Sequence, residues 1–239
     1  MIKGSVAQIE SLGLVDGPGI RTVVFLSGCK LRCLFCHNPE MFKKGEENYT
    51  PEELFEKIIR NKPYFNRNNG GVTFSGGEPL LQSKFVIEVC KLLKQENVHI
   101  ALDTAGVGNG NYEEILNLVD LVIFDIKAIT NTKYKEMTSN NIDESLEFLN
   151  ICQKLNKKMW LRQVIVPGIN DNLQYIDELA NFINKLKNIE KVELLPYHTM
   201  AKEKYEKLNI LYKLANIIDM DIEKCKELEE LLREKINII

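Results

Sequence analysis

The sequence lacks the features that would place a protein in a membrane or on nucleic acid. No apolar run approaches the roughly 20 residues that span a bilayer. The N-terminal residues 1–5 lack the apolar core and the cleavage site of a signal peptide. Long blocks of like charge are also missing, and the formal net charge is only −3. We therefore expect a cytoplasmic protein that binds neither membrane nor nucleic acid.

Cysteine is scarce outside one short stretch of the chain. Three of the six cysteines lie singly within helical patterns, where we expect them to fill the core: Cys90, Cys152 and Cys225. The other three, Cys29, Cys33 and Cys36, lie within eight residues of one another. Because thiols stay reduced in the cytoplasm, this group indicates a metal centre or catalysis rather than disulfides.

A fourth cysteine is missing from this group. A structural zinc site normally closes with four ligands, and a ferredoxin-type iron-sulfur cluster takes four thiolates. Three thiolates therefore either recruit a distant fourth ligand or leave one metal position open, where chemistry can occur. A zinc site with His37 as fourth ligand, and buried thiols without any metal, both stay open as interpretations of the spacing alone.

Short β-branched runs alternate with helical patterns along the chain. Strands are predicted at residues 21–26, 72–74, 98–102, 121–124, 159–166 and 192–195. Helices are predicted from a capping box at Thr50 and Glu53, and at 83–95, 112–118, 172–186 and 222–234, with a helical stretch broken around 139–141. Because parallel strands need crossover connections, this alternation predicts an α/β fold, a partial (β/α)6 TIM-like barrel with parallel strands, in a single domain spanning residues 1–239.

Unusual polar residues fall at or near the carboxyl ends of the predicted strands, the edge where parallel α/β sheets build their active sites. A structural zinc site would not require such a ring of polar residues. The ring comprises the cysteine group, Gly76-Gly77-Glu78, Asp103-Thr104, Asp125 to Lys127, Arg162 and Tyr197-His198.

Four motifs follow one another along the chain: VDGPGIR at 15–21, C-x3-C-x2-C-H-N at 29–38, GGVTFSGGE at 70–78 and ELLPYH at 193–198. The set resembles the radical S-adenosylmethionine (SAM) superfamily, and within it the glycyl-radical enzyme activases. The resemblance covers essentially the whole chain. No cysteine lies between Cys36 and Gly76, which favours the single-cluster type that acts on pyruvate formate-lyase.

The resemblance implies a radical mechanism. Cys29, Cys33 and Cys36 would be the catalytic ligands of a 4Fe-4S cluster, and SAM would bind its open iron. Reductive cleavage of SAM would give a 5′-deoxyadenosyl radical that removes hydrogen from a glycine of pyruvate formate-lyase, the protein partner. Flavodoxin or ferredoxin would supply the electron.

The same resemblance assigns the SAM pocket. Phe35 and His37 flank Cys36 and would line it, although the family often has tyrosine in place of Phe35. His198 would approach the adenosine. Further cofactor-binding residues are expected at the ends of the second and fourth strands, with Glu78 ordering the glycine loop: Gly76, Gly77, Glu78, Asp125, Ile126 and Lys127.

Several roles stay open from the residues alone. Lys127 could pair with a carboxylate of SAM or partner, or form a surface ion pair with Asp125. Asp103 and Asp125 could hold a small cation. Asp16 and Arg21 could contact the partner or simply form a turn, and Arg162 could pair with a carboxylate or contact SAM.

Three other functions also fit the sequence. The chain could activate a different glycyl-radical enzyme, or it could be a radical SAM enzyme acting on a small molecule. A non-enzymatic iron-sulfur or zinc regulator is the third. A regulator would usually carry four ligands or a nucleic-acid-binding element, and neither is evident.

Overall fold

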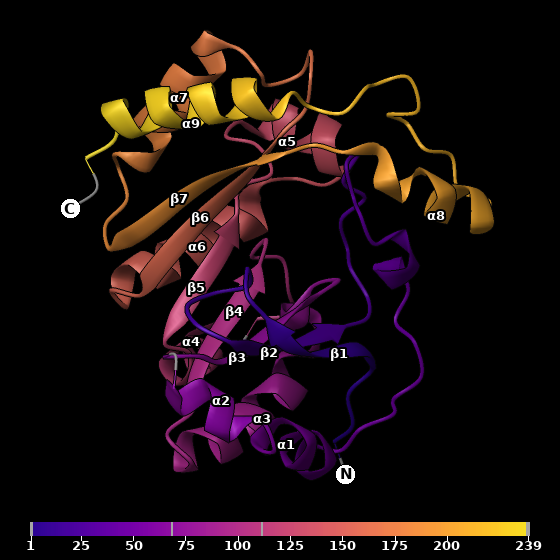
Figure 1. Cartoon of the computed structure of the whole chain (residues 1–239), viewed down its shortest axis with the longest axis vertical. Coiled ribbons are helices and arrows are strands. Elements are labelled where there is room, and N and C mark those ends of the chain that lie inside the picture. Colours follow the sequence, from indigo (N-terminus) through magenta and orange to yellow (C-terminus); the bar gives the residue numbers. More distant parts are fainter. Residues whose placement is uncertain (1, 68, 111, 238–239) are drawn as a thin grey trace.

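The computed structural model describes residues 2–67, 69–110 and 112–237. Residue 1 of the N-terminal segment and the last two residues of the predicted domain lie outside this range. One seven-stranded sheet runs in the order β1-β2-β3-β4-β5-β6-β7 (Figure 1). Its strands are β1 (Val6–Gly13), β2 (Arg21–Leu26), β3 (Gly71–Gly76), β4 (His99–Thr104), β5 (Leu121–Asp125), β6 (Lys158–Ile165) and β7 (Ile189–Pro196).

The strands β2 to β7 run parallel to one another, and each corresponds to one of the six predicted strands. The predicted fold class, a partial TIM-like barrel, is confirmed. Strand β1 was not predicted; it pairs antiparallel with β2 at the edge of the sheet. Most side chains of β1 are exposed, so it lacks the buried apolar run by which the other strands could be found.

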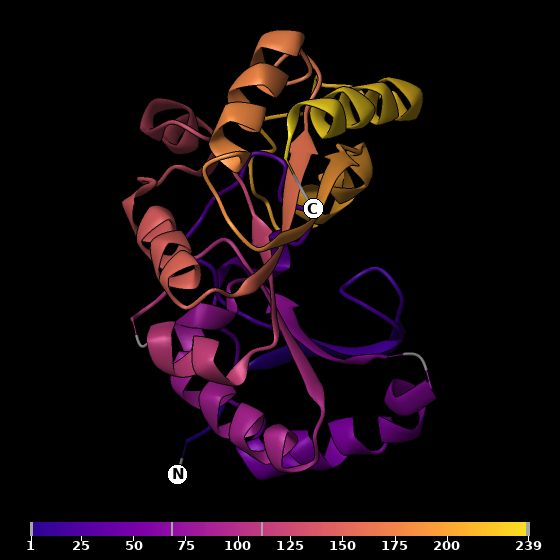
Figure 2. The same cartoon turned by 90° about the vertical axis from the view of Figure 1, so that its left-hand side faces the viewer.

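Helices cover one side of the curved sheet, and the opposite side is left open (Figure 2). The larger helices are α1 (Pro51–Ile59), α3 (Ser83–Gln95), α4 (Tyr112–Leu118), α5 (Asn131–Thr138), α6 (Asp143–Lys154), α7 (Leu173–Ile183) and α9 (Ile222–Lys235). Shorter ones are η1 (Pro39–Phe42), α2 (Lys62–Arg67), η2 (Pro79–Gln82), η3 (Thr199–Ala201) and α8 (Lys202–Lys207). The predicted capping box is present: the Glu53 N–H donates to the Thr50 hydroxyl, and the Thr50 N–H donates to Glu53 Oε2 at 2.8 Å.

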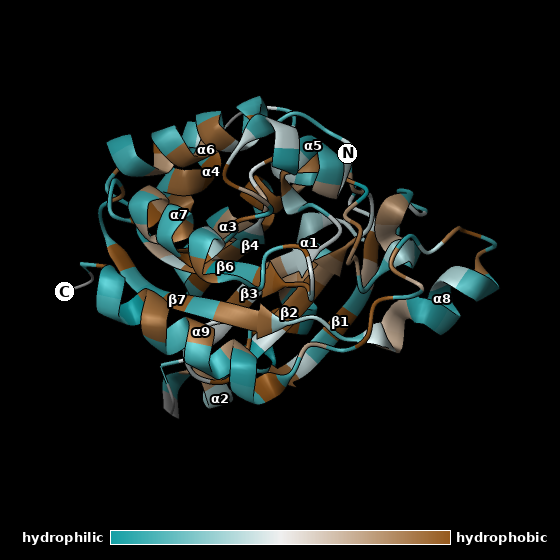
Figure 3. Cartoon of the chain, turned by 90° about the horizontal axis from the view of Figure 1, so that it is seen from above, coloured by the Kyte–Doolittle hydropathy of each residue, from teal (hydrophilic) through white to brown (hydrophobic). Residues whose placement is uncertain are grey.

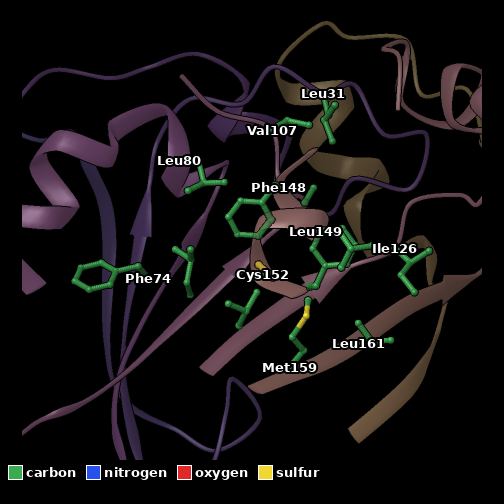
Figure 4. Packing of buried hydrophobic residues seen from close by; sticks show 14 of the residues in the cluster. Leu31, Phe74, Leu80, Val107, Ile126, Phe148, Leu149, Cys152, Met159 and Leu161 are labelled. Atoms are coloured by element: carbon green, nitrogen blue, oxygen red, sulfur yellow. The ribbon is translucent and has the colours of Figure 1, made fainter. Parts of the chain in front are cut away.

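The hydrophobic core fills the space between the sheet and its helices. Phe74 of β3 and Met159 of β6 lie in the same buried cluster as Phe148, Leu149 and Cys152 of α6 (Figure 4). Hydrophobic residues gather on the strands, and polar residues on the outer turns of the helices (Figure 3). The three isolated cysteines are buried, as predicted. No helix among the described residues has the length and apolarity to cross a bilayer.

Candidate active site

A cavity of about 430 Å³ opens at the carboxyl ends of the parallel strands. This volume lies in the range of small-molecule sites. Ten of the predicted site residues line it together: Cys29, Cys33, Phe35, Cys36, His37, Gly76, Gly77, Asp125, Lys127 and His198. Asp16, Asp103, Thr104 and Arg162 contribute as well. The register of the sheet therefore brings the predicted rim residues to one place.

The cysteine loop follows β2 and is held by backbone hydrogen bonds. The Gly28 N–H donates to Met41 O at 2.9 Å, which closes the loop on itself. The Arg32 N–H donates to Thr138 O at 2.8 Å, and the Leu34 N–H donates to Met137 O at 2.9 Å. The carboxyl end of α5 thus fixes the middle of the loop, so the three thiols face the cavity from a defined backbone.

All three thiols are free. Burial raises the pKa of Cys29 to about 12, that of Cys33 to about 12 and that of Cys36 to about 11. Buried thiols of this kind become ligands when a metal centre displaces their protons. Three soft sulfur donors around one cavity suit the irons of a cluster.

The rings of His37 and His198 meet edge to face, with 4.5 Å between their centroids. Burial, followed by the neighbouring His198 and Lys204, lowers the pKa of His37. Nδ1 of each ring is buried and has no hydrogen-bond partner among the residues that the structure describes. An unsatisfied buried nitrogen costs about 1–3 kcal/mol. Both histidines line the cavity.

The glycine loop after β3 brings backbone close to the cysteine loop. Gly76 has a φ of +113°, a conformation that side chains rarely adopt. The Gly77 N–H donates to Leu26 O at 2.7 Å. A Cβ on Gly77 would lie 2.3 Å from Gly28 O, so only glycine fits there.

Glu78 is 1% exposed and does not line the cavity. Its Oε1 accepts hydrogen bonds from the Thr104 hydroxyl at 2.5 Å and the Leu80 N–H at 3.1 Å. Its Oε2 accepts the Ala105 N–H at 3.0 Å. These bonds tie the loop after β3 to the end of β4. Glu78 is thus placed to order the loop from behind, and, unlike Gly76 and Gly77, it does not line the cavity.

Glu78 should make stability depend on pH. Burial raises the pKa of its carboxyl from 4.5 to about 7. Between these values the folded state binds more protons than the unfolded state, so the free energy of unfolding should fall as the pH rises from about 4.5 to about 7. Glu78→Gln should flatten this slope. Urea unfolding of the cluster-free protein across that range tests it; an unchanged slope in the variant would contradict the assignment.

Lys127 donates to Asp125 Oδ2 at 2.7 Å, and its side chain is only 14% exposed. The ion pair with Asp125, one of the two roles left open for Lys127, is thus present, and it lies half-buried on the cavity wall. The Lys127 ammonium also lies 5.5 Å from the centre of the Phe35 ring. A cation and an aromatic face are thus presented together on the cavity wall.

Asp103 accepts a hydrogen bond from the Ser75 hydroxyl at 2.7 Å. Its Oδ1 is buried and unpartnered. Burial, followed by the charge of Asp125, raises the pKa of Asp103 to about 6. Within the described ranges, no three His, Cys, Asp or Glu side chains are grouped to hold a single metal ion. The small cation at these two carboxylates stays a prediction.

Ile126 and Arg21 do not line the cavity, whereas Arg162 does. Ile126 is buried in the core, and its N–H donates to Arg162 O at 2.8 Å. Arg21 is fully buried at the start of β2 and donates to Thr73 Oγ1 at 2.6 Å, which leaves no accessible surface for a partner. Arg162 lines the cavity and also donates to Glu193 Oε2 at 3.1 Å.

Some cavity residues were not predicted. Ser75 holds Asp103, and Asn38, Val164, Leu195 and Pro196 are among the other lining residues. Asn38, Ser75, Leu195 and Pro196 stand inside the quoted motifs, but those motifs alone do not separate lining residues from supporting ones. Strand periodicity could have found Val164, because it lies two positions from Arg162 and so shares its face.

Comparison with known proteins places this arrangement in a family. Residues 23–183 match the model of the radical SAM superfamily. A radical SAM methyltransferase from Sphaerobacter thermophilus has the same fold, with a TM-score of 0.67 at 18% identity over 99% of this chain and 76% of its own. The chain is thus a radical SAM enzyme, and this class implies a 4Fe-4S cluster and SAM.

Two curated relatives narrow the class. A pyruvate formate-lyase-activating enzyme from Clostridium pasteurianum is 53% identical and covers 98% of this chain and 99% of its own length. One from Staphylococcus epidermidis is 41% identical, covering 95% of this chain and 94% of its own. The chain belongs to the family of the pyruvate formate-lyase-activating enzymes.

Proposed function

We propose that this protein activates pyruvate formate-lyase under anaerobic conditions by generating a glycyl radical on it. The observation that carries the proposal is the 53% identity to an activating enzyme over 98% of the chain. The cavity supports it, because three free thiols, the rings of His37 and His198 and the glycines Gly76 and Gly77 all line it.

Cys29, Cys33 and Cys36 would hold three irons of the cluster, which leaves the fourth iron for the amino and carboxylate groups of SAM. When bound and reduced by one electron, the cluster and SAM would supply the radical chemistry that removes a hydrogen atom from a glycine α-carbon, with methionine as the other product of SAM cleavage. The role of the protein is to bind, orient and exclude water.

The chain's own residues divide that role. His37 and His198 present buried ring nitrogens to the nucleoside, and Phe35 offers an aromatic face. Gly76 and Gly77 let backbone carbonyls approach the methionyl amino group. Beside them Lys127, paired with Asp125, offers a buried positive charge to the carboxylate end of SAM.

Partners and location complete the proposal. Flavodoxin or ferredoxin supplies the electron in the cytoplasm, and the glycine-bearing segment of pyruvate formate-lyase enters the cavity. A small cation would sit between Asp103 and Asp125, near the carboxylate of SAM. The test is the cation dependence of activity in Asp103→Asn and Asp125→Asn. If both variants depend on added cation as the wild type does, the proposed cation site is wrong.

The test is to mix the reduced, reconstituted protein with SAM and pyruvate formate-lyase without oxygen and to record an electron paramagnetic resonance (EPR) spectrum. We expect a glycyl radical on pyruvate formate-lyase, and cleavage of that chain at the radical glycine when oxygen is admitted. A radical on another glycyl-radical enzyme instead would favour the alternative partner. SAM cleavage with a small molecule and no protein radical would overturn the proposal.

A further inference from the structure

Two segments far apart in the chain lie against each other beside the cavity. One is residues 36–42, which begin at the third cysteine and include η1; the other is residues 197–207, which follow β7 and include α8. Cys36 and Tyr205, one from each segment, are 169 positions apart. Both segments also supply a cavity residue, His37 and His198. Their contact therefore bears on the site itself.

Lys204 makes the most specific of these contacts. Its ammonium donates to His37 O at 3.0 Å, to Asn38 Oδ1 at 2.9 Å and to Glu40 Oε1 at 2.9 Å. An ammonium has three protons, and here each one has an acceptor. All three acceptors belong to the four residues that follow Cys36, so this side chain is fitted to the cysteine loop.

Tyr205, the next residue, holds the cysteine itself. Its hydroxyl donates to Cys36 O at 3.2 Å. The side chain is buried, its ring lies edge to face with Phe42 at 6.3 Å between centroids, and it lies 4.6 Å from the ring of Tyr212. The donor is thus held in place by packing. Two consecutive residues of α8 therefore bind the carbonyls of two consecutive residues, Cys36 and His37.

We propose that Lys204 and Tyr205 are positioning residues for the cluster: they hold the peptide plane after Cys36 and so aim its thiolate and the His37 ring. Fixing a carbonyl fixes the backbone dihedral that orients the neighbouring side chain. Lys204 also balances the negative charge of Glu40 beside a site that will carry an anionic cluster, and nearby charge sets cluster potentials. This inference rests on the proposed function, since it assumes that Cys36 ligates iron.

The test measures the cluster rather than turnover. Lys204→Met keeps the length of the side chain and removes its donors, and Tyr205→Phe keeps the ring and removes the hydroxyl. We expect iron release to a chelator to be about tenfold faster in each variant. A factor of ten corresponds to about 1.4 kcal/mol, which is the size of the hydrogen-bonding contribution that each variant loses. In Lys204→Met the unbalanced Glu40 should also make the cluster's reduction potential more negative.

Lys207→Met is the matched control. Lys207 is exposed on the same helix, and its side chain makes no hydrogen bond or ion pair within the ranges that the structure describes. It should release iron at the wild-type rate, whereas Lys204→Arg, which keeps the charge, should restore the potential. Unchanged melting of the cluster-free variants would exclude general unfolding.

Wild-type iron release and potential in both Lys204→Met and Tyr205→Phe would overturn the inference. If the wild-type protein loads a cluster but leaves no radical on pyruvate formate-lyase, the proposed partner fails, while the iron-release comparison still decides the role of Lys204 and Tyr205. If the wild-type protein loads no cluster, both fail.

Discussion

Replacing Cys33 by alanine is expected to abolish the reduced-cluster signal and SAM cleavage while leaving the fold intact. Cys33 is buried in the middle of the loop. Two remaining thiolates cannot hold three irons, and the substitution removes only one sulfur atom from a loop that is fixed by backbone bonds to α5. The loss should therefore be chemical rather than structural.

The measurement is anaerobic reconstitution with iron and sulfide, followed by EPR of the dithionite-reduced protein with and without SAM. The wild-type spectrum should change shape when SAM is added, because SAM binds the open iron. Cys152→Ala is a matched control: Cys152 is a fully buried cysteine in α6, within the hydrophobic core, and its removal should leave the signal. If the protein instead binds zinc stably and shows no EPR signal of a reduced cluster, the three cysteines have a structural role.

The rim of the sheet was predictable for a physical reason. Strand ends can be found from apolar runs, and parallel strands bring those ends to one edge, so Asp103, Asp125 and His198 could be placed together before any contact was known. Ile126 shows the limit of that reasoning. It stands between two cavity residues in sequence, but alternation along an extended chain turns its side chain into the core.

Other parts of the site had no signal in the sequence. Lys204 and Tyr205 contact the cysteine loop across 164 to 169 positions, and no local pattern encodes such a contact. The edge strand β1 is largely exposed and so gives no hydrophobic period. Glu78 could be placed in the glycine loop, but its burial and its three donors follow only from the approach of β4.

Gly77→Ala should break the contact between the glycine loop and the cysteine loop. The added Cβ would lie 2.3 Å from Gly28 O, 2.8 Å from the carbonyl carbon of that residue and 3.1 Å from Met41 O. All three are backbone atoms, so no side chain can rotate away. Gly28 O also accepts the Glu78 N–H, and Met41 O accepts the Gly28 N–H, each at 2.9 Å. Relief of the clash must therefore break the contact between the glycine loop and the cysteine loop.

We expect Gly77→Ala to lower the free energy of unfolding by about 3 kcal/mol, the upper range for overpacking, and to lose the SAM-induced change in the EPR spectrum. Gly168→Ala is the matched control, because its Cβ would meet no atom within 4 Å although its φ is +73°. That backbone strain should cost about 1 kcal/mol and leave the cluster unaffected. Equal stability losses in the two variants would show that the close approach of the loops contributes nothing of its own. A Gly77→Ala protein that still responds to SAM would show that the glycine loop can retreat from the cysteine loop without disturbing the site.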